Sequence, residues 1–566
     1  MTTTSLKAGG AHGNDLRGLQ EAANATTPNR IDRHDFDGRF NRMFDKLPPA
    51  VFSLNDIDSL AMSMVAEDET PQTPETETDS EENVGTAADP GIPAGYTYFG
   101  QFVDHDLTLD AVSLSMKQED VSGVENFRTP ALDLDSVYAR GPDDQPYMYD
   151  PSGRELLLGN RDLKSGAAGV ALTKDLLRVQ GRAVIGDKRN DENVIVSQLQ
   201  GLFIHFHNKL AEEFAGATFD EVRQQVRWTY QWLVLWDYLP RIVGRDLVDQ
   251  ILPPGSAHPN LKYFAPKTTA YIPIEFTGAA YRFGHSMIRP IYRLNQADNI
   301  GGPAGDSGRR LVFAPQDTNS GLNGFQEFDA GLGVDWTLFF ETGNKTLASE
   351  IGKDKHRIQP AYKIDPSLVF PTSKLPEFSN PDGTPKNDGG VAAINILAQR
   401  NLRRGMMLGL PSGQAVARHL KIPVIPDDEL ILAKAQSDDF DPPAGGKQES
   451  IADGRPTMRD SAPLWFYVLA EARHEWHKKV AKLLAQPENA TATGDARKKI
   501  IDSVPTRLGL VGGRIVAETL IGLVAADSRS LLNEGLLKGF RPPIGDEKKS
   551  GYARLTMGDL VTFVQG

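Results

Sequence analysis

Residues 99–106 read Phe-Gly-Gln-Phe-Val-Asp-His-Asp, and this short segment decides how the rest of the chain is interpreted. A histidine flanked by two aspartates and preceded by a glutamine is an unusual grouping of polar side chains. An imidazole titrates near neutral pH, so His105 is a candidate acid–base residue. By itself the segment fits a surface turn, part of a metal site or an acid–base site, and its spacing does not separate these three interpretations.

Three further segments follow in the same chain. They are Gly-Asp-Lys-Arg-Asn-Asp-Glu-Asn at 186–193, Arg-Phe-Gly-His at 282–285, and Asn-Leu-Arg-Arg-Gly at 401–405 with Gly-Leu-Pro at 409–411. Together and in this order, the segments resemble the animal-type haem peroxidases of the peroxidase–cyclooxygenase superfamily, from about residue 93 to at least residue 411. Each motif alone is a weak signal, whereas four in register are a strong one.

The resemblance implies a distal side of a haem pocket. His105 matches the distal histidine, whose imidazole takes a proton from one peroxide oxygen and returns it to the other. Arg189 matches the distal arginine, whose permanent charge stabilises the leaving oxygen. Gln101 matches a distal-pocket glutamine, which either places water and halide or only hydrogen-bonds distal water.

The resemblance also implies a proximal side, with haem b as the cofactor. His285 matches the proximal iron ligand, and a neutral imidazole that binds iron needs a partner for its other nitrogen. Asn401 occupies the position of that partner. Arg282 and Arg404 match the arginines that pair with the haem propionates.

Covalent attachment of the haem is a further implication. Asp104 and Glu192 match the carboxylates that form ester bonds to haem methyl groups in many family members. Asn193 stands where one member has a methionine that forms a third, sulfonium link, so that link is not expected. The loss of this methionine also makes chloride a less favoured substrate than bromide, iodide or thiocyanate.

A calcium site is implied beside the distal histidine. The segment Thr-Pro-Ala-Leu-Asp-Leu-Asp at 129–135 places oxygen donors at alternate positions, and calcium prefers six to eight hard oxygen ligands. An ion bound there would anchor the backbone next to His105. The positions that match the family's calcium ligands are Asp106, Thr129, Ala131 through its carbonyl, Asp133 and Asp135.

Hydrophobic periodicity outside the motifs is helical. Apolar residues from 194 to 214 recur at spacings of three and four, which is typical of one buried helix face. Similar patterns predict helices near 221–243, 392–408, 464–485 and 512–525. We therefore expect a mainly α fold with long loops and little β structure. One large helical haem peroxidase domain is expected over residues 36–566, after a flexible N-terminal arm at 1–35.

Two segments interrupt this domain. Residues 66–90 are acidic and nearly free of large apolar side chains, so we expect a disordered insertion. Residues 436–460 contain Pro, Gly and charges and are expected to form a loop. His205 and His207 lie on the amphipathic pattern at 194–214, and we interpret both as structural residues rather than metal ligands.

Composition excludes several classes of site. The chain has 566 residues, a formal net charge of -14 and no cysteine. Thiolate haem ligation, iron–sulfur clusters and cysteine zinc sites are therefore excluded, and an acidic chain is not expected to bind nucleic acid. No signal peptide or membrane span is recognisable. We expect a soluble, bacterial-like member of the family, cytoplasmic or secreted without a leader, and its oligomeric state stays open.

Two other functions stay open beside a peroxidase that uses hydrogen peroxide and small aromatic, phenolic, halide or pseudohalide donors. Fatty-acid dioxygenases and cyclooxygenases of the same superfamily carry a tyrosine three residues before the proximal histidine. Here that position is Arg282, and Tyr281 is one residue too early. The second alternative is a haem- and calcium-binding adhesion or matrix protein without catalysis. Retention of His105, Arg189 and His285 disfavours it.

Overall fold

Helices dominate the structure, a computed structural model, as the sequence predicts. It describes residues 40–67, 80–109, 126, 128–166, 169–266, 270–296, 308–313, 321–343, 345–347, 357–388, 391–441, 448–546 and 555–565. The longer helices are α3 (Leu54–Ser63), α4 (Gly95–Leu107), α6 (Val194–Glu213), α7 (Phe219–Leu233), α12 (Leu397–Met407), α13 (Gly413–Leu420), α15 (Leu464–Leu484), α16 (Gly494–Asp502), α17 (Leu510–Ala526) and α18 (Met557–Gln565).

Short helices and turns connect these elements. Those that matter for the site are the 3-10 helices η6 (Lys188–Asp191) and η8 (Ala280–His285). A π-helical segment, η7 (Val234–Tyr238), joins α7 to α8 (Leu239–Val243), and α9 (Arg245–Ile251) follows. Further single turns include α5 (Asp135–Tyr138), α10 (Ile274–Gly278), α14 (Ser437–Phe440) and η11 (Pro376–Phe378).

The described strands form only two-stranded pairs. Strand β1 (Phe40–Asn41) pairs with β6 (Ile272–Pro273) in parallel, with Phe40 opposite Ile272. The other pairs are antiparallel: β2 (Leu158–Lys164) with β3 (Ala171–Leu176), β4 (Arg178–Val179) with β5 (Arg182–Ala183), β7 (Ile291–Arg293) with β8 (Arg309–Leu311), and β9 (Asn387–Asp388) with β10 (Val391–Ala392). None of these pairs is large enough to form a sheet core, so the core is built from helices.

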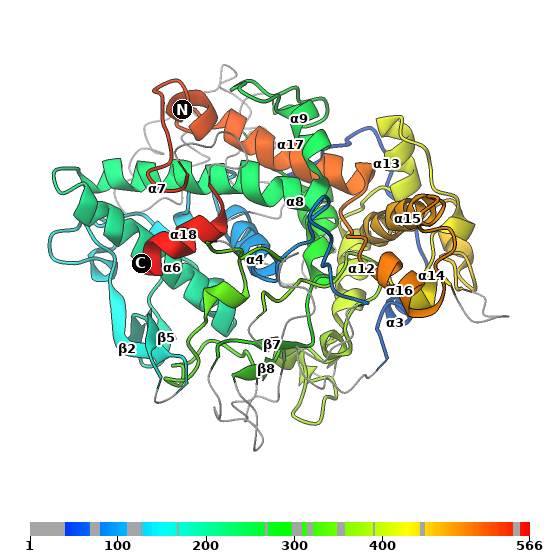
Figure 1. Cartoon of the computed structure of the whole chain (residues 1–566), viewed down its shortest axis with the longest axis horizontal. Coiled ribbons are helices and arrows are strands. Elements are labelled where there is room, and N and C mark those ends of the chain that lie inside the picture. Colours follow the sequence, from blue (N-terminus) through cyan, green and yellow to red (C-terminus); the bar gives the residue numbers. More distant parts are fainter. Residues whose placement is uncertain are drawn as a thin grey trace, which may run out of the picture.

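Helix α4 lies in the middle of the molecule, between α6 and α7 on one side and the α12–α15 region on the other (Figure 1). It packs against α6, η6 and η8. Its apolar side chains, including Phe99 and Phe102, are fully buried and contact the rings of Phe203 and Tyr230. Because α4 is central, its polar residues His105 and Asp106 are buried as well.

Asp237 explains how an acidic residue fits into the apolar stretch at 230–239. Its buried carboxylate accepts hydrogen bonds from the Tyr96 hydroxyl at 2.6 Å and from the Met557 backbone amide at 2.8 Å, and it pairs with Arg241 at 2.9 Å. A buried charge is tolerated when it is paired and hydrogen-bonded. Asp237 thereby fixes η7 against the start of α4 and the start of α18.

The predicted helices are confirmed, with shifts at their ends. Helix α6 matches the pattern at 194–214, and α7, η7 and α8 together span 219–243. Helix α12 begins at Leu397 rather than at 392, because residues 391–392 form strand β10 instead. Among the described residues, no helix is long and apolar enough to cross a membrane.

The prediction of a disordered insertion at 66–90 is wrong for residues 80–90. Residues 80–90 pack into the molecule, and Glu82 is fully buried. The Glu82 carboxylate pairs with Arg289 at 2.6 Å and with Arg357 at 2.7 Å. The predicted loop at 436–460 contains the short helix α14. Residues 1–35, 68–79 and 442–447 lie outside the described residues.

Candidate active site

Four of the predicted site residues project from the last two turns of α4. They are Gln101, Asp104, His105 and Asp106. The helix approaches η7 closely, since a Cβ atom on Gly100 would lie 2.5 Å from the Tyr238 hydroxyl. Glycine at position 100 therefore permits the contact that sets the depth of α4 in the core.

A hydrogen bond fixes the tautomer of His105. Its Nδ1 lies 2.8 Å from the side-chain oxygen of Asn190, and the Asn190 amide nitrogen donates to Gln200 at 2.8 Å. Because the amide oxygen can only accept, Nδ1 carries the proton. The other ring nitrogen, Nε2, is then an acceptor, and it lies 4.0 Å from a carboxylate oxygen of Glu192. The ring thus presents a proton-accepting atom toward Glu192.

The environment keeps His105 neutral. Burial, followed by the positive charge of Arg189, lowers the pKa of His105 to about 4. Both effects disfavour the imidazolium form. At neutral pH the ring is therefore an unprotonated base.

Arg189 is held by the carboxylate of Asp187. Asp187 is the N-cap of η6 and accepts the Arg189 backbone amide at 2.9 Å. It also accepts hydrogen bonds from Nε at 3.1 Å and from Nη2 at 2.7 Å of the Arg189 side chain. Nη2 donates in addition to the carbonyls of His105, at 3.0 Å, and Thr108. Nη1 donates to no residue that the structure describes.

Gln101, Glu192 and Asn193 form one polar group next to His105. The Gln101 amide donates to a Glu192 carboxylate oxygen, and the Asn193 amide donates to the Gln101 oxygen at 3.2 Å. Asn193 is also the N-cap of α6, where its side-chain oxygen accepts the amides of residues 195 and 196. Burial raises the pKa of Glu192 to about 7. This carboxyl is therefore part protonated at neutral pH.

On the opposite side, η8 presents His285 and α12 presents Asn401. The Asn401 amide lies 2.7 Å from His285 Nδ1, and Nε2 has no hydrogen-bond partner among the described residues. Burial, followed by Arg282 and Arg404, lowers the pKa of His285 to about 3, so the ring is neutral. An iron-bound Nε2 would leave the proton on Nδ1, and Asn401 would then accept it with its amide oxygen turned toward the ring.

Two guanidinium groups lie close to this pair. Burial, followed by the charge of Arg404, lowers the pKa of Arg282 to about 9, and burial also lowers that of Arg404. Arg282 donates to the Thr277 carbonyl at 2.8 Å and to Asn401 at 3.4 Å, with no carboxylate partner in the described part of the chain. The negative charge of Asp104 partly opposes this lowering of the pKa at both arginines, so Asp104 lies near them. Asp104 on α4 thus faces the proximal side, and the arginine pair suits an anionic group.

Unfilled space lies next to Glu192, a neighbour of His105, and next to Gly284, which precedes His285. Glu192 lies deep in the molecule, yet 34% of its side chain is accessible. A Cβ atom on Gly284, beside His285, would meet nothing within 4 Å. Open space, a free imidazole nitrogen and two partly buried cations are features that fit a haem with its iron and its propionates.

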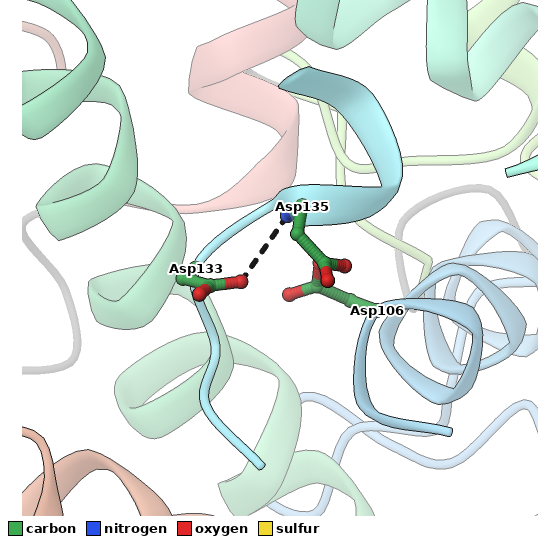
Figure 2. Close-up of side chains that lie close together, drawn as sticks. All are labelled: Asp106, Asp133 and Asp135. Atoms are coloured by element: carbon green, nitrogen blue, oxygen red, sulfur yellow. Dashed lines mark hydrogen bonds between the residues drawn. The ribbon is translucent and has the colours of Figure 1, made fainter. Parts of the chain in front are cut away.

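Three of the predicted calcium ligands lie close together beside the last turn of α4. Carboxylate oxygens of Asp106, Asp133 and Asp135 all lie within 4.8 Å of one another (Figure 2). Thr129 donates to Asp133 at 2.8 Å, and Ala131 belongs to the same loop. Burial, followed by Asp133 and Asp135, raises the pKa of Asp106 well above its usual range. Such a group of carboxylates suits a hard cation.

Three residues escaped the sequence analysis. Asn190 fixes the His105 ring, although only its place beside Arg189 in the motif could have pointed to it. Asp187 was quoted only as part of the motif. Arg128 pairs with Asp135 at 3.2 Å, so part of the charge of that carboxylate is already compensated.

Both ring nitrogens of His207 on α6 make hydrogen bonds. His207 is fully buried, and its two ring nitrogens lie 2.9 Å from the Tyr138 hydroxyl and 2.9 Å from the Arg154 carbonyl. Neither His205 nor His207 belongs to a metal-binding group among the described residues. A ring with both nitrogens occupied has no atom left for a metal.

Comparison with known proteins gives related sequences over part of the chain. The family described as Animal haem peroxidase matches residues 115–335. This range includes Arg189, Glu192 and His285, whereas His105 and Asn401 lie on either side of it. Thyroid peroxidase from Rattus norvegicus is 24% identical over 214 residues, which are 34% of this chain and 22% of that protein. The chain thus aligns with less than two thirds of this relative.

One solved structure shares the fold over most of the chain. Peroxidase A from Dictyostelium discoideum superposes with a TM-score of 0.52 at 14% identity and covers 96% of both chains. A fatty acid alpha-dioxygenase from Arabidopsis thaliana gives a TM-score of 0.48 at 13% identity, over 89% of this chain and 74% of that one. At such low identity the likeness to peroxidase A shows the fold alone.

Proposed function

The chain belongs to the animal haem peroxidase superfamily, and on this premise we propose that it is a haem-dependent peroxidase. It reduces hydrogen peroxide and oxidises small donors. The observation that carries the proposal is the state of its two histidines. His105 is neutral with Nδ1 protonated, and His285 is neutral with Nε2 free. One ring is prepared as a base and the other as an iron ligand.

The residues of α12 and η8 would hold the haem. His285 Nε2 would bind the iron, and Asn401 would fix its ring. Arg282 and Arg404 would pair with the propionates, whose negative charge would offset that of the two partly buried guanidinium groups. Asp104 and Glu192 would form the ester bonds to haem methyl groups. When bound, haem supplies an iron that accepts peroxide and passes oxidising equivalents to donors.

His105 would move the proton. With haem bound, Nε2 would accept a proton from one oxygen of hydrogen peroxide and return it to the other oxygen, which would leave as water. A positioned base of this kind contributes roughly 10²–10⁴-fold to the rate. Arg189 carries a permanent charge beside His105, and its Nη1 remains to donate to the leaving oxygen.

The proposed donors are small aromatic or phenolic molecules, or bromide, iodide and thiocyanate. Gln101 would place water or halide, because its amide group lies between Glu192 and Asn193. Asn193 is occupied as the N-cap of α6 and offers no thioether for a sulfonium link. The absence of a thioether at position 193 supports oxidation of bromide, iodide or thiocyanate rather than oxidation of chloride.

Calcium is proposed at the carboxylate cluster of Asp106, Asp133 and Asp135, with Thr129 and the Ala131 carbonyl as further ligands. Three carboxylates within 4.8 Å of one another support this proposal, since clustered carboxylate oxygens are the ligands that calcium prefers. Asp106 follows His105 directly on α4, so an ion there would hold the end of this helix.

The test is haem titration followed by donor turnover. The full chain should bind one haem with a ferric Soret band and oxidise guaiacol with hydrogen peroxide. His285→Ala should lose the proximal ligation spectrum, whereas His258→Ala, in a loop outside the site, should match the wild type. Full haem binding without guaiacol oxidation, together with oxygenated fatty-acid products, would instead favour a dioxygenase. Haem binding with neither activity would favour a non-catalytic binding protein.

A further inference from the structure

A row of four alternating charges runs from the carboxylate cluster to the distal arginine. Asp135 pairs with Arg128 at 3.2 Å, Arg128 pairs with Asp187 at 2.7 Å, and Asp187 pairs with Arg189 at 2.7 Å. The first three members are nearly buried, with 9%, 9% and 1% of their side chains accessible. Buried ion pairs of this kind respond strongly when one partner is removed, because an uncompensated charge is left behind.

Arg128 binds more than one part of the loop before Arg189. Its Nε donates to Asp187 at 3.0 Å, and its Nη2 donates to the Gly186 carbonyl at 2.9 Å. A Cβ atom on Gly186 would lie 2.6 Å from the Ser136 carbonyl, so the loop at 186–189 lies directly against the loop at 128–136. The planar guanidinium suits this arrangement, because its fork reaches several acceptors at once.

Asp187 in turn determines the direction of the Arg189 side chain. It accepts both Nε and Nη2 of that guanidinium and therefore leaves Nη1 as the edge without a partner in the described structure. Arg189 is also tied to the His105 carbonyl at 3.0 Å, at the end of α4. Any shift of Asp187 would thus change where the free edge points relative to His105.

We propose that Arg128 is a positioning residue for the distal pocket: it anchors Asp187 to Asp135 and thereby orients Arg189 toward the iron-bound ligand. The Arg128 guanidinium acts through its contacts with Asp135, Asp187 and the Gly186 carbonyl. The inference rests on the proposed peroxidase function. It predicts that an anionic ligand of the iron is bound less tightly when Arg128 is replaced.

Cyanide binding to the ferric holoenzyme is the test. Hydrogen cyanide gives its proton to a base and binds the iron as an anion, so its equilibrium affinity reports on His105 and Arg189 without turnover. In Arg128→Leu the cyanide Kd, read from the Soret shift, should rise about tenfold or more, because charge-assisted hydrogen bonds contribute about 1.5–3 kcal/mol. Haem stoichiometry should stay at the wild-type value.

Two variants make the result specific. Arg128→Lys keeps the charge but not the fork, so its cyanide Kd should fall between wild type and Arg128→Leu. If Arg128→Leu does not fold, the cyanide Kd of Arg128→Lys still tests the inference. Arg227→Leu is the matched control: Arg227 pairs with Asp527 at similar burial, on α7 away from the site. This variant should lower the melting temperature and leave cyanide affinity unchanged.

Wild-type cyanide affinity in haem-loaded Arg128→Leu and Arg128→Lys would overturn the inference and leave the proposed function intact. An equal loss of affinity in Arg227→Leu would also overturn it, since the effect would then reflect stability alone. A wild-type protein that binds neither haem nor cyanide would overturn the proposed function itself. Failure of the Arg128 inference and failure of the proposed peroxidase function therefore give different results.

Discussion

His105 and Asn190 form a hydrogen-bonded pair in which ring Nδ1 lies 2.8 Å from the amide oxygen. Asn190 cannot rotate freely, because its amide nitrogen donates to Gln200. The pair therefore selects the ring tautomer that leaves Nε2 available to accept a proton.

Asn190→Leu should slow the reaction of the ferric holoenzyme with hydrogen peroxide by about 10- to 100-fold, because His105 then samples the wrong tautomer. Stopped-flow absorbance of the Soret band measures this rate. Asn208→Leu on α6 serves as a control for replacing a hydrogen-bonded asparagine outside the site, since Asn208 contacts the backbone of Leu156. A wild-type rate in Asn190→Leu would show that the tautomer is fixed in some other way.

The pH dependence of the same rate should follow the lowered pKa of His105. Burial and then Arg189 lower this pKa to about 4, so the neutral base persists as the pH falls through 6.5. The rate should therefore decline only around pH 4. Arg189→Gln removes one of the two lowering effects, and its acid limb should shift to higher pH. An acid limb at pH 6.5 or above in the wild type would contradict this prediction.

Haem should become covalently bound after exposure to hydrogen peroxide. Acidified-acetone extraction should leave haem on the wild type and release it from the double variant Asp104→Asn, Glu192→Gln. Glu377→Gln is the matched control, since Glu377 is near enough to raise the pKa of Glu192 but is not a proposed ester residue. Complete extraction of haem from peroxide-treated wild type would exclude both ester bonds.

Calcium should stabilise the protein against unfolding. Three clustered carboxylates repel one another without a cation, and a ligand at about 100 times its Kd adds about 2.7 kcal/mol. Thermal unfolding with and without a calcium chelator should show a higher melting temperature with calcium. Asp133→Asn should lose this difference, while Asp162→Asn, at an exposed pair with Lys174, should keep it. A melting temperature independent of calcium would reject the site.

The sequence reveals the histidines and arginines of the site because each lies in a short motif. His105, Arg189 and His285 need only local neighbours to be recognised, and the period of α6 is visible in its apolar residues. The function of Arg128 is not visible, since it depends on two loops that meet in space. Residues 80–90 are misjudged for the same reason. In the sequence, Glu82 looks like a solvent-exposed acidic residue. In the structure, Arg289 and Arg357 from distant parts of the chain pair with it.

The central claim is that His105 is the base of a haem peroxidase. Its most direct test is the second-order rate of hydrogen peroxide with the ferric holoenzyme, measured by stopped flow in wild type and His105→Ala. The account predicts a loss of at least about 100-fold in the variant, with haem binding unchanged. Equal rates in the two proteins would contradict it.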